Sequence, residues 1–307
     1  MELHPFYQAM VDAYREAGRP SFHQLAPEDA RAQMRDTIAA APKAQDLPDL
    51  AKVEDMTVEG PNGPIAIRLY EPKGEVLGTC VYLHAGGWVI GDIDLSDNTC
   101  RRLSGRAGCR IVSVDYRKAP EHPYPQPLDD AWSVLTWAAG EFAGSLAIAG
   151  ESAGGNLAAA CAIRARNSGG PALAGQLLAY PATDHDLGTG SYRQVGDKGW
   201  LLSTADMRWF WDHYCPEGVN REQPEISPLR VESAAGLPPM FIALAELDPL
   251  RDEGIAFASR LASEGVQVSM RCDPGMAHGY LSAAGVLAPA AEALDDAVRW
   301  LRNRLGS

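Results

Sequence analysis

The chain has 307 residues, of which 46% are hydrophobic and 22% charged, and this composition excludes a disordered or fibrous protein. Its 27 basic and 40 acidic residues give a formal net charge of −13, so nucleic acid and anionic membranes are not expected partners. No apolar run approaches the roughly 18 residues of a membrane-spanning helix, and the first residues lack the pattern of a secretory signal. We therefore expect a cytoplasmic protein.

The first 50 residues are expected to be helical. Apolar residues between Phe6 and Tyr14 recur at helical spacing, and Pro27 is followed by two acidic residues, which is typical of a helix start. Strand patterns begin only after this segment. Residues 56–58 and 65–70 flank a turn rich in Gly and Pro, and they predict a hairpin.

From residue 78 onward, short apolar runs alternate with segments of helical length. The runs are residues 80–83, 111–114, 146–149, 177–180, 240–245 and 266–270. Nearly continuous apolar runs are typical of parallel strands that helices cover on both faces. The helical segments include residues 129–139, 152–166, 254–263 and 290–305. The sequence therefore predicts an α/β fold with a doubly wound sheet.

Residues 183–230 interrupt this alternation. They contain no parallel-strand pattern but several large aromatic residues, which favours a helical insertion above the sheet.

Neither the six cysteines nor the seven histidines indicate a metal site. There is no C-x-x-C pair and no H-E-x-x-H spacing, so we interpret the cysteines as buried small hydrophobes in a reducing compartment. No G-x-G-x-x-G sequence opens a βαβ unit, and no Walker A sequence occurs. We expect no metal and no other cofactor.

One serine lies where a nucleophile is expected. Gly150-Glu151-Ser152-Ala153-Gly154 stands between the predicted strand 146–149 and the predicted helix that follows it. A strand, a G-x-S-x-G turn and a helix form a nucleophile elbow, because only small residues fit beside the serine in so tight a turn. Ser152 is therefore the candidate nucleophile. The alternative is a glycine-rich turn that only packs or binds phosphate.

A serine hydroxyl needs a base and an orienting carboxylate, because it is too weak an acid to attack unaided near neutral pH. Asp248 follows the predicted strand 240–245, and His278 follows the next strand, which is the chain order expected after such an elbow. Both lie where the carboxyl ends of parallel strands assemble a site. Glu246 and Asp252 are competing acids, although Asp252 is better explained as a first-turn acid of the next helix.

An oxyanion hole is predicted directly after the strand 80–83. The sequence HAGGW (84–88) stands where an HGGG-type motif supplies backbone N–H groups. Gly86 and Gly87 let the backbone approach the substrate, and Ala153 adds the N–H group that follows the nucleophile. His84 is then expected to hold the loop in place and not to act as a base.

Five segments together resemble the hormone-sensitive-lipase family (family IV) of bacterial carboxylesterases, in the α/β-hydrolase superfamily. They read HAGGW (84–88), DYRKAPEHPYP (115–125), GESAGGN (150–156), DPLRDE (248–253) and HGY (278–280). The resemblance implies an α/β-hydrolase fold, with a mostly parallel sheet between helices, a helical cap and often a homodimer. It makes residues 1–50 an N-terminal cap segment and residues 51–307 a catalytic domain with a cap insertion at about 183–230.

The same resemblance implies that Ser152, His278 and Asp248 are the nucleophile, base and orienting acid, and that Gly86, Gly87 and Ala153 are the oxyanion donors. Two positions depart from the family pattern. Ala85 replaces the first glycine of HGGG, which puts the acyl and alcohol preference in doubt. Glu151 stands where the family commonly has Asp, which is a milder change.

The predicted activity is hydrolysis of small-molecule carboxylic esters of short to medium acyl chain. An amidase, a lactonase or a deacetylase would use the same triad, and a non-catalytic small-molecule receptor on this scaffold is disfavoured by the complete triad. The candidate substrate-binding residues are the aromatic Trp88, Trp200, Trp209, Phe210 and Tyr214. Aromatic residues at helical spacing also build cores, so only about half of those in the insertion are expected to line a pocket.

Overall fold

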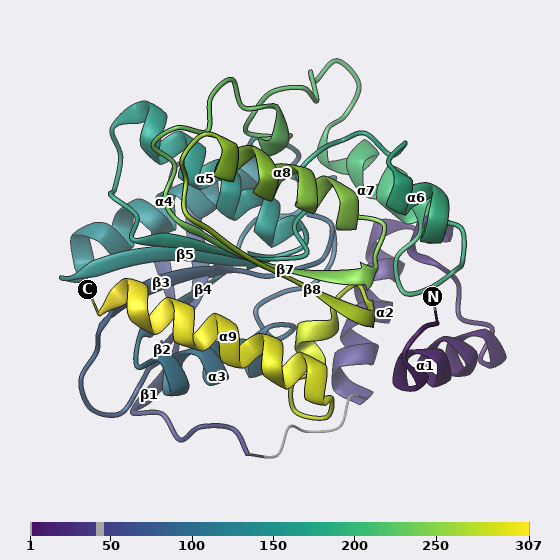
Figure 1. Cartoon of the computed structure of the whole chain (residues 1–307), viewed down its shortest axis with the longest axis horizontal. Coiled ribbons are helices and arrows are strands. Elements are labelled where there is room, and N and C mark those ends of the chain that lie inside the picture. The colour runs from purple at the N-terminus through teal and green to yellow at the C-terminus, as the bar shows by residue number, and fades with distance from the viewer. Residues whose placement is uncertain (1, 41–45, 307) are drawn as a thin grey trace.

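The computed structural model describes residues 2–40 and 46–306, and an eight-stranded sheet runs through its centre (Figure 1). The strand order is β1-β2-β4-β3-β5-β6-β7-β8. The strands are β1 (Lys52–Gly60), β2 (Gly63–Glu71), β3 (Gly78–Leu83), β4 (Arg110–Asp115), β5 (Ser145–Glu151), β6 (Gly175–Ala179), β7 (Met240–Leu247) and β8 (Val268–Ala277). β1 and β2 form the predicted antiparallel hairpin, β2 pairs antiparallel with β4, and the other pairs are parallel. The predicted mostly parallel sheet is confirmed.

Helices cover both faces of this sheet. α3 (Asp97–Ala107) and α9 (Ala288–Leu305) pack together on one face, while α4 (Gln126–Glu141), α5 (Ala153–Ser168) and α8 (Arg251–Ser263) lie on the other (Figure 1). Every residue of β3 and β6 is buried as a result, which explains the unbroken apolar runs 80–83 and 177–179 within them. In the described ranges, no helix has the length and apolar character needed to cross a membrane.

A second group of helices lies beyond the carboxyl ends of the parallel strands (Figure 1). It consists of α1 (Pro5–Glu16), α2 (Pro27–Ala40), α6 (Gly190–Val195) and α7 (Thr204–Tyr214). The 3₁₀ turn η1 (Phe22–Gln24) connects α1 to α2, and the 3₁₀ turn η2 (Pro228–Arg230) follows α7 in the sequence. Residues 183–230 thus contain α6, α7 and η2 and no strand. Residues 1 and 41–45, which belong to the predicted N-terminal helical segment, lie outside the described residues.

Polar contacts join the N-terminal helices of this group to residues 183–230, among them one from Arg15 to the Lys198 carbonyl and one from His23 to Asp206. The backbone N–H of His23 donates to the Asp206 carboxylate over 3.0 Å, and the Nδ1 atom of His23 lies 2.8 Å from the same oxygen. η1 is thereby attached to the first turn of α7, although the two residues stand 183 positions apart in the sequence.

The direction in which successive strands are added to the sheet reverses at β3, because β4 lies on one side of β3 and β5 lies on the other. At such a switch point, the loops that leave two neighbouring parallel strands diverge and open a crevice at the carboxyl edge. Here the loop after β3 carries residues 84–88, and the turn after β5 carries Ser152. The sheet topology therefore places the two predicted glycine-rich motifs side by side.

Two elements differ from the sequence-based expectation. α3 was not predicted, because its buried side is built from small or polar residues such as Thr99, Cys100 and Ser104. β8 is longer than the predicted run 266–270 and ends directly before His278. As an edge strand it exposes Met270, Cys272 and Pro274 between less exposed positions, so a search for apolar runs recognises only its beginning.

Candidate active site

Ser152 occupies a strained turn between β5 and α5. Its backbone has φ +55° and ψ −119°, a region that residues other than glycine rarely adopt. Ser152 is also the N-cap residue of α5. A Cβ atom on Gly150 would lie 2.2 Å from the carbonyl oxygen of Gly154, and one on Gly154 would lie 2.0 Å from that of Leu83. The glycines are thus required by the close approach of three backbone segments, as the elbow pattern predicts.

Ser152, His278 and Asp248 form one chain of hydrogen bonds. The Ser152 Oγ atom lies 2.9 Å from Nε2 of His278, and Nδ1 of His278 lies 2.7 Å from Oδ2 of Asp248. His278 directly follows β8 and Asp248 directly follows β7, so neighbouring strands position them. The other Asp248 oxygen, Oδ1, accepts from the backbone N–H of Leu250 over 2.9 Å.

The competing acids have other roles. Asp252 lies in the first turn of α8, as expected, and its carboxylate accepts from the backbone N–H of Ser191 over 2.7 Å. Glu246 accepts from the backbone N–H of Gly275 over 2.8 Å. Both carboxylates hold loops near the site, and neither has a hydrogen bond to His278 among the described residues.

Three backbone N–H groups near Ser152 are available to a ligand. The loop after β3 is turned by Gly86, with φ +128°, and Gly87, with φ +56°, and the Gly86 carbonyl accepts from Val89 and Ile90. Within the described part of the chain, the N–H groups of Gly86, Gly87 and Ala153 have no hydrogen-bond acceptor. Unpaired donors at the N-terminus of α5 and in this loop suit a negatively charged oxygen.

The His84 side chain packs beneath the loop after β3 and holds it in place. Its ring is fully buried and stacks on Tyr116 with centroids 4.2 Å apart, and Nδ1 lies 2.6 Å from the carbonyl oxygen of Ala85. Burial, together with the positive charge of Lys118, lowers the pKa of His84 to about 4. The imidazole is therefore neutral near pH 7 and packs as part of the loop.

Glu151 is buried beneath the nucleophile. Its two carboxylate oxygens accept hydrogen bonds from the phenol groups of Tyr82 and Tyr180, the latter over 2.8 Å. Burial raises the pKa of this carboxyl group, and the phenol donors oppose that effect. The Tyr180 ring in turn packs edge-on against the His278 ring, with centroids 4.9 Å apart.

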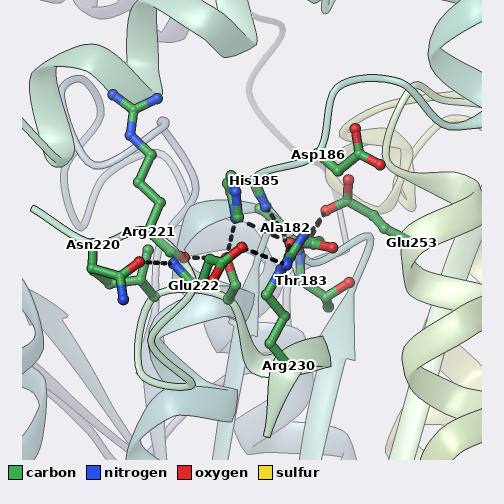
Figure 2. Close-up of polar contacts among 12 residues, drawn as sticks. Ala182, Thr183, His185, Asp186, Asn220, Arg221, Glu222, Arg230 and Glu253 are labelled. Carbon is green, nitrogen blue, oxygen red and sulfur yellow. Dashed lines mark hydrogen bonds and ion pairs between the residues drawn. The ribbon is translucent and has the colours of Figure 1, made fainter.

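The strand-end loops are also tied to the segment 183–230. Asn156 in α5 donates through Nδ2 to the carbonyls of Ala182 and Ile226, over 2.9 and 2.8 Å. Glu253 in α8 accepts from the backbone N–H groups of Thr183 and Asp184, and Figure 2 shows this carboxylate beside Thr183. Burial raises the pKa of Glu253 well above its usual range.

A cavity of about 410 Å³ opens above Ser152 and His278. Of the predicted substrate-binding residues, Trp88, Trp200 and Phe210 line it. Trp209 and Tyr214 are not among the lining residues. The Tyr214 ring is fully buried and stacks on Trp88 with centroids 4.4 Å apart, and Trp209 packs against His213 along the outer side of α7.

Residues 1–50 were expected to form part of a cap, but none of the predicted substrate-binding residues comes from them, although several line the cavity. Residues of α1, η1 and α2, such as Tyr14 and Met34, form part of its wall, as does Arg19 between α1 and η1. Arg31 of α2 also reaches the loop after β3, because its Nε donates to the carbonyl of Val89 over 2.8 Å. Nothing in the local sequence of residues 2–40 predicts these contacts, which depend on how distant segments pack.

No group of three or more His, Cys, Asp or Glu side chains could hold a metal ion in residues 2–40 and 46–306. The hydrogen-bonded chain from Ser152 to Asp248 can transfer a proton, and the unpaired N–H groups nearby can bind an anionic oxygen.

The sequence profile of a family with the α/β-hydrolase fold matches residues 80–282, well over half of the chain. The chain belongs to the α/β-hydrolase family. It is 38% identical over 295 residues to esterase LipI of Mycobacterium tuberculosis, and the alignment covers 91% of this chain and 90% of that relative. It is 32% identical to the ethyl acetate hydrolase of Pseudomonas putida, over 99% and 100% of the two chains.

The structure is also similar to the crystal structure of a mutant α/β hydrolase from the metagenome of Lake Arreo, with a TM-score of 0.93 and 36% identity over 99% of each chain. With these relatives, this α/β hydrolase is a serine carboxylesterase of the hormone-sensitive-lipase type that acts on small-molecule esters. The predicted family, fold and class of reaction are confirmed.

Proposed function

We propose that this esterase cleaves short- to medium-chain acyl esters through an acyl-enzyme formed on Ser152. The observation that carries the proposal is the unbroken chain from Ser152 through His278 to Asp248, with distances of 2.9 and 2.7 Å. His278 takes the proton as the Ser152 oxygen bonds to the ester carbon, and the carbonyl oxygen becomes negatively charged. The buried Asp248 carboxylate orients the imidazole and stabilises its protonated form.

The N–H groups of Gly86, Gly87 and Ala153 are the proposed donors to that oxygen. When the tetrahedral intermediate collapses, the carbon–oxygen bond to the alcohol breaks, and His278 returns its proton to the leaving alcohol. Water then attacks the acyl-enzyme while His278 accepts one of its protons. Collapse of the second intermediate releases the carboxylic acid and restores Ser152.

The volume of the cavity supports a small substrate. At about 410 Å³ it lies near the lower end of the roughly 300–1,000 Å³ that small-molecule sites occupy. Apolar wall residues such as Met34, Leu202 and Phe210 favour an apolar acyl or alcohol group. Ala85 also lines the cavity, so its methyl group takes space that glycine would leave open.

The test is hydrolysis of 4-nitrophenyl esters from acetate to laurate without added metal. We expect kcat to fall on the order of 10⁴-fold or more in Ser152→Ala and strongly in Asp248→Asn, with both variants folded. Ser282→Ala is a matched control, because Ser282 lines the same cavity and, within the described residues, its hydroxyl bonds only to the Gly279 carbonyl. Retained activity in Ser152→Ala would contradict the assigned nucleophile. Turnover of amides or lactones but of no ester would favour the alternative reactions.

We also propose that residues 1–50 and 183–230 together form a cap over the catalytic domain, since both segments line the cavity. A cytoplasmic location is supported by six free cysteines, five of them buried, which suit a reducing compartment. Homodimerisation and the absence of nucleic acid among the partners stay predictions. Light scattering of the purified protein tests the first, and a gel-shift assay tests the second.

A further inference from the structure

Arg19 lines the cavity above Ser152, at the end of the turn that follows α1. Its Nη2 atom donates to the Gln33 carbonyl over 2.8 Å and to the hydroxyl of Thr37, and its guanidinium lies over the Tyr14 ring, 4.6 Å from the centroid. Tyr14, Gln33 and Thr37 line the same cavity, so the charged end of Arg19 is fixed in the wall.

The partners of this guanidinium are all neutral. In residues 2–40 and 46–306 it forms no ion pair, and its Nε and Nη1 atoms have no hydrogen-bond acceptor. The chain has 13 more acidic than basic residues, so this guanidinium lacks a carboxylate partner although carboxylates are in excess. The wall therefore presents a positive charge, held in a fixed orientation, with N–H donors still available.

The two carboxylates of the cavity are bound elsewhere. Asp206 accepts from His23 and Ser203, and Glu151 accepts from two buried phenols. Arg15, the second cation of the lining, donates to the Lys198 carbonyl and lies 3.7 Å from an oxygen of Asp12. Of the two described arginines that line the cavity, Arg19 is thus the one without a carboxylate partner in residues 2–40 and 46–306.

We propose that Arg19 binds an anionic group, such as a carboxylate, on the substrate at a distance from the ester bond. The inference rests on the proposed function, because it assumes that the ester carbonyl lies at Ser152. A guanidinium binds carboxylates through charge-assisted hydrogen bonds, and its planar shape gives them a defined direction. The preferred substrates are then esters of dicarboxylic acids, or of alcohols that carry an acid group, over neutral esters of the same size.

The experiment compares two matched pairs of esters. Mono-4-nitrophenyl adipate and 4-nitrophenyl heptanoate differ in charge at the end of the acyl chain, and 4-acetoxybenzoate and 4-methylphenyl acetate differ in charge on the alcohol side. Each pair is assayed with the wild-type chain, Arg19→Gln, Arg19→Lys and Arg35→Gln. Arg35 is the matched control, because it is exposed on α2 and does not line the cavity.

In at least one pair, we expect Arg19→Gln to lower kcat/KM for the anionic ester about 10-fold, mainly through KM, and to leave the neutral ester within about 2-fold. Arg19→Lys should keep part of the preference, and Arg35→Gln should keep all of it. Added salt should weaken the preference of the wild type, because it screens the charge of an accessible guanidinium.

Equal loss on both esters of each pair, or no effect of Arg19→Gln, would overturn the proposal. Equal loss would mean that Arg19 only holds α2 through Gln33 and Thr37. Failure of the proposed function looks different, because the wild-type chain would then hydrolyse no ester at all, including the neutral ones.

Discussion

Gly87 and Phe210 provide a sharp test of how the loop after β3 fits beneath α7. A Cβ atom built on Gly87 would lie 2.2, 2.3 and 2.6 Å from three carbon atoms of the Phe210 ring. Non-bonded carbons are optimally about 3.5–4.0 Å apart, so the ring would have to retreat by more than about 1 Å. Because the φ of Gly87 is +56°, an alanine there is also strained for a reason that does not involve Phe210.

The two effects can be separated because only the overpacking involves the Phe210 ring. The left-handed backbone costs an alanine about 1–2 kcal/mol, and overpacking costs about 1–3 kcal/mol, so Gly87→Ala should lower the free energy of unfolding by about 2–5 kcal/mol. Phe210→Ala alone should cost about 3–5 kcal/mol, because the ring is buried. In the double variant no ring meets the new methyl group. Its loss in free energy of unfolding should therefore be about 1–3 kcal/mol smaller than the sum of the losses in the two single variants.

Urea denaturation of the wild type, the two single variants and the double variant measures this coupling. Gly86→Ala is the control, because a Cβ on Gly86 would lie 2.0 Å from the backbone carbonyl of Ile90, which no side-chain truncation relieves. Combined with Phe210→Ala it should be additive. Additivity within about 0.5 kcal/mol for the Gly87 pair as well would refute the packing argument.

Two further predictions concern buried polar groups. Because the folded pKa of His84 is about 4, the unfolded chain binds this proton first as the pH falls below about 6.5, so the free energy of unfolding should decrease by about 3 kcal/mol between pH 6.5 and 4. His84→Asn should show a correspondingly flatter dependence in urea denaturation, and an unchanged slope would contradict this. Asn156→Ala leaves the carbonyls of Ala182 and Ile226 without their donor, which should cost about 2–4 kcal/mol in thermal unfolding. Asn156→Asp should cost at least as much, and a Tm equal to that of the wild type in either variant would refute this.

The sequence predicted those parts of the molecule that depend on local patterns. Apolar runs located the parallel strands, and the positions after their carboxyl ends located Ser152, Asp248 and His278. These residues meet because the parallel strands all end at one edge of the sheet. No knowledge of side-chain packing was needed for that step.

The cavity wall could not be predicted in the same way. Phe210 and Tyr214 are four residues apart on one side of α7, yet only Phe210 reaches the cavity, because the Trp88 ring covers Tyr214. Arg19 belongs to no sequence motif. Its position in the cavity wall is evident only from its contacts with Tyr14, Gln33 and Thr37. Such assignments require the packing of segments that are far apart in the chain.

The cavity is built from two separate parts of the chain, and this affects how the substrate range of the enzyme can be engineered. The groups proposed to break the ester lie at the ends of β3, β5, β7 and β8, whereas α1, η1 and α2 contribute only wall. Randomising positions 11, 14, 19 and 34 should therefore diversify the compounds that are accepted while the turnover step is retained. Arg31 should be kept unchanged in such a library, because its side chain bonds α2 to the Val89 carbonyl, directly after residues 84–88.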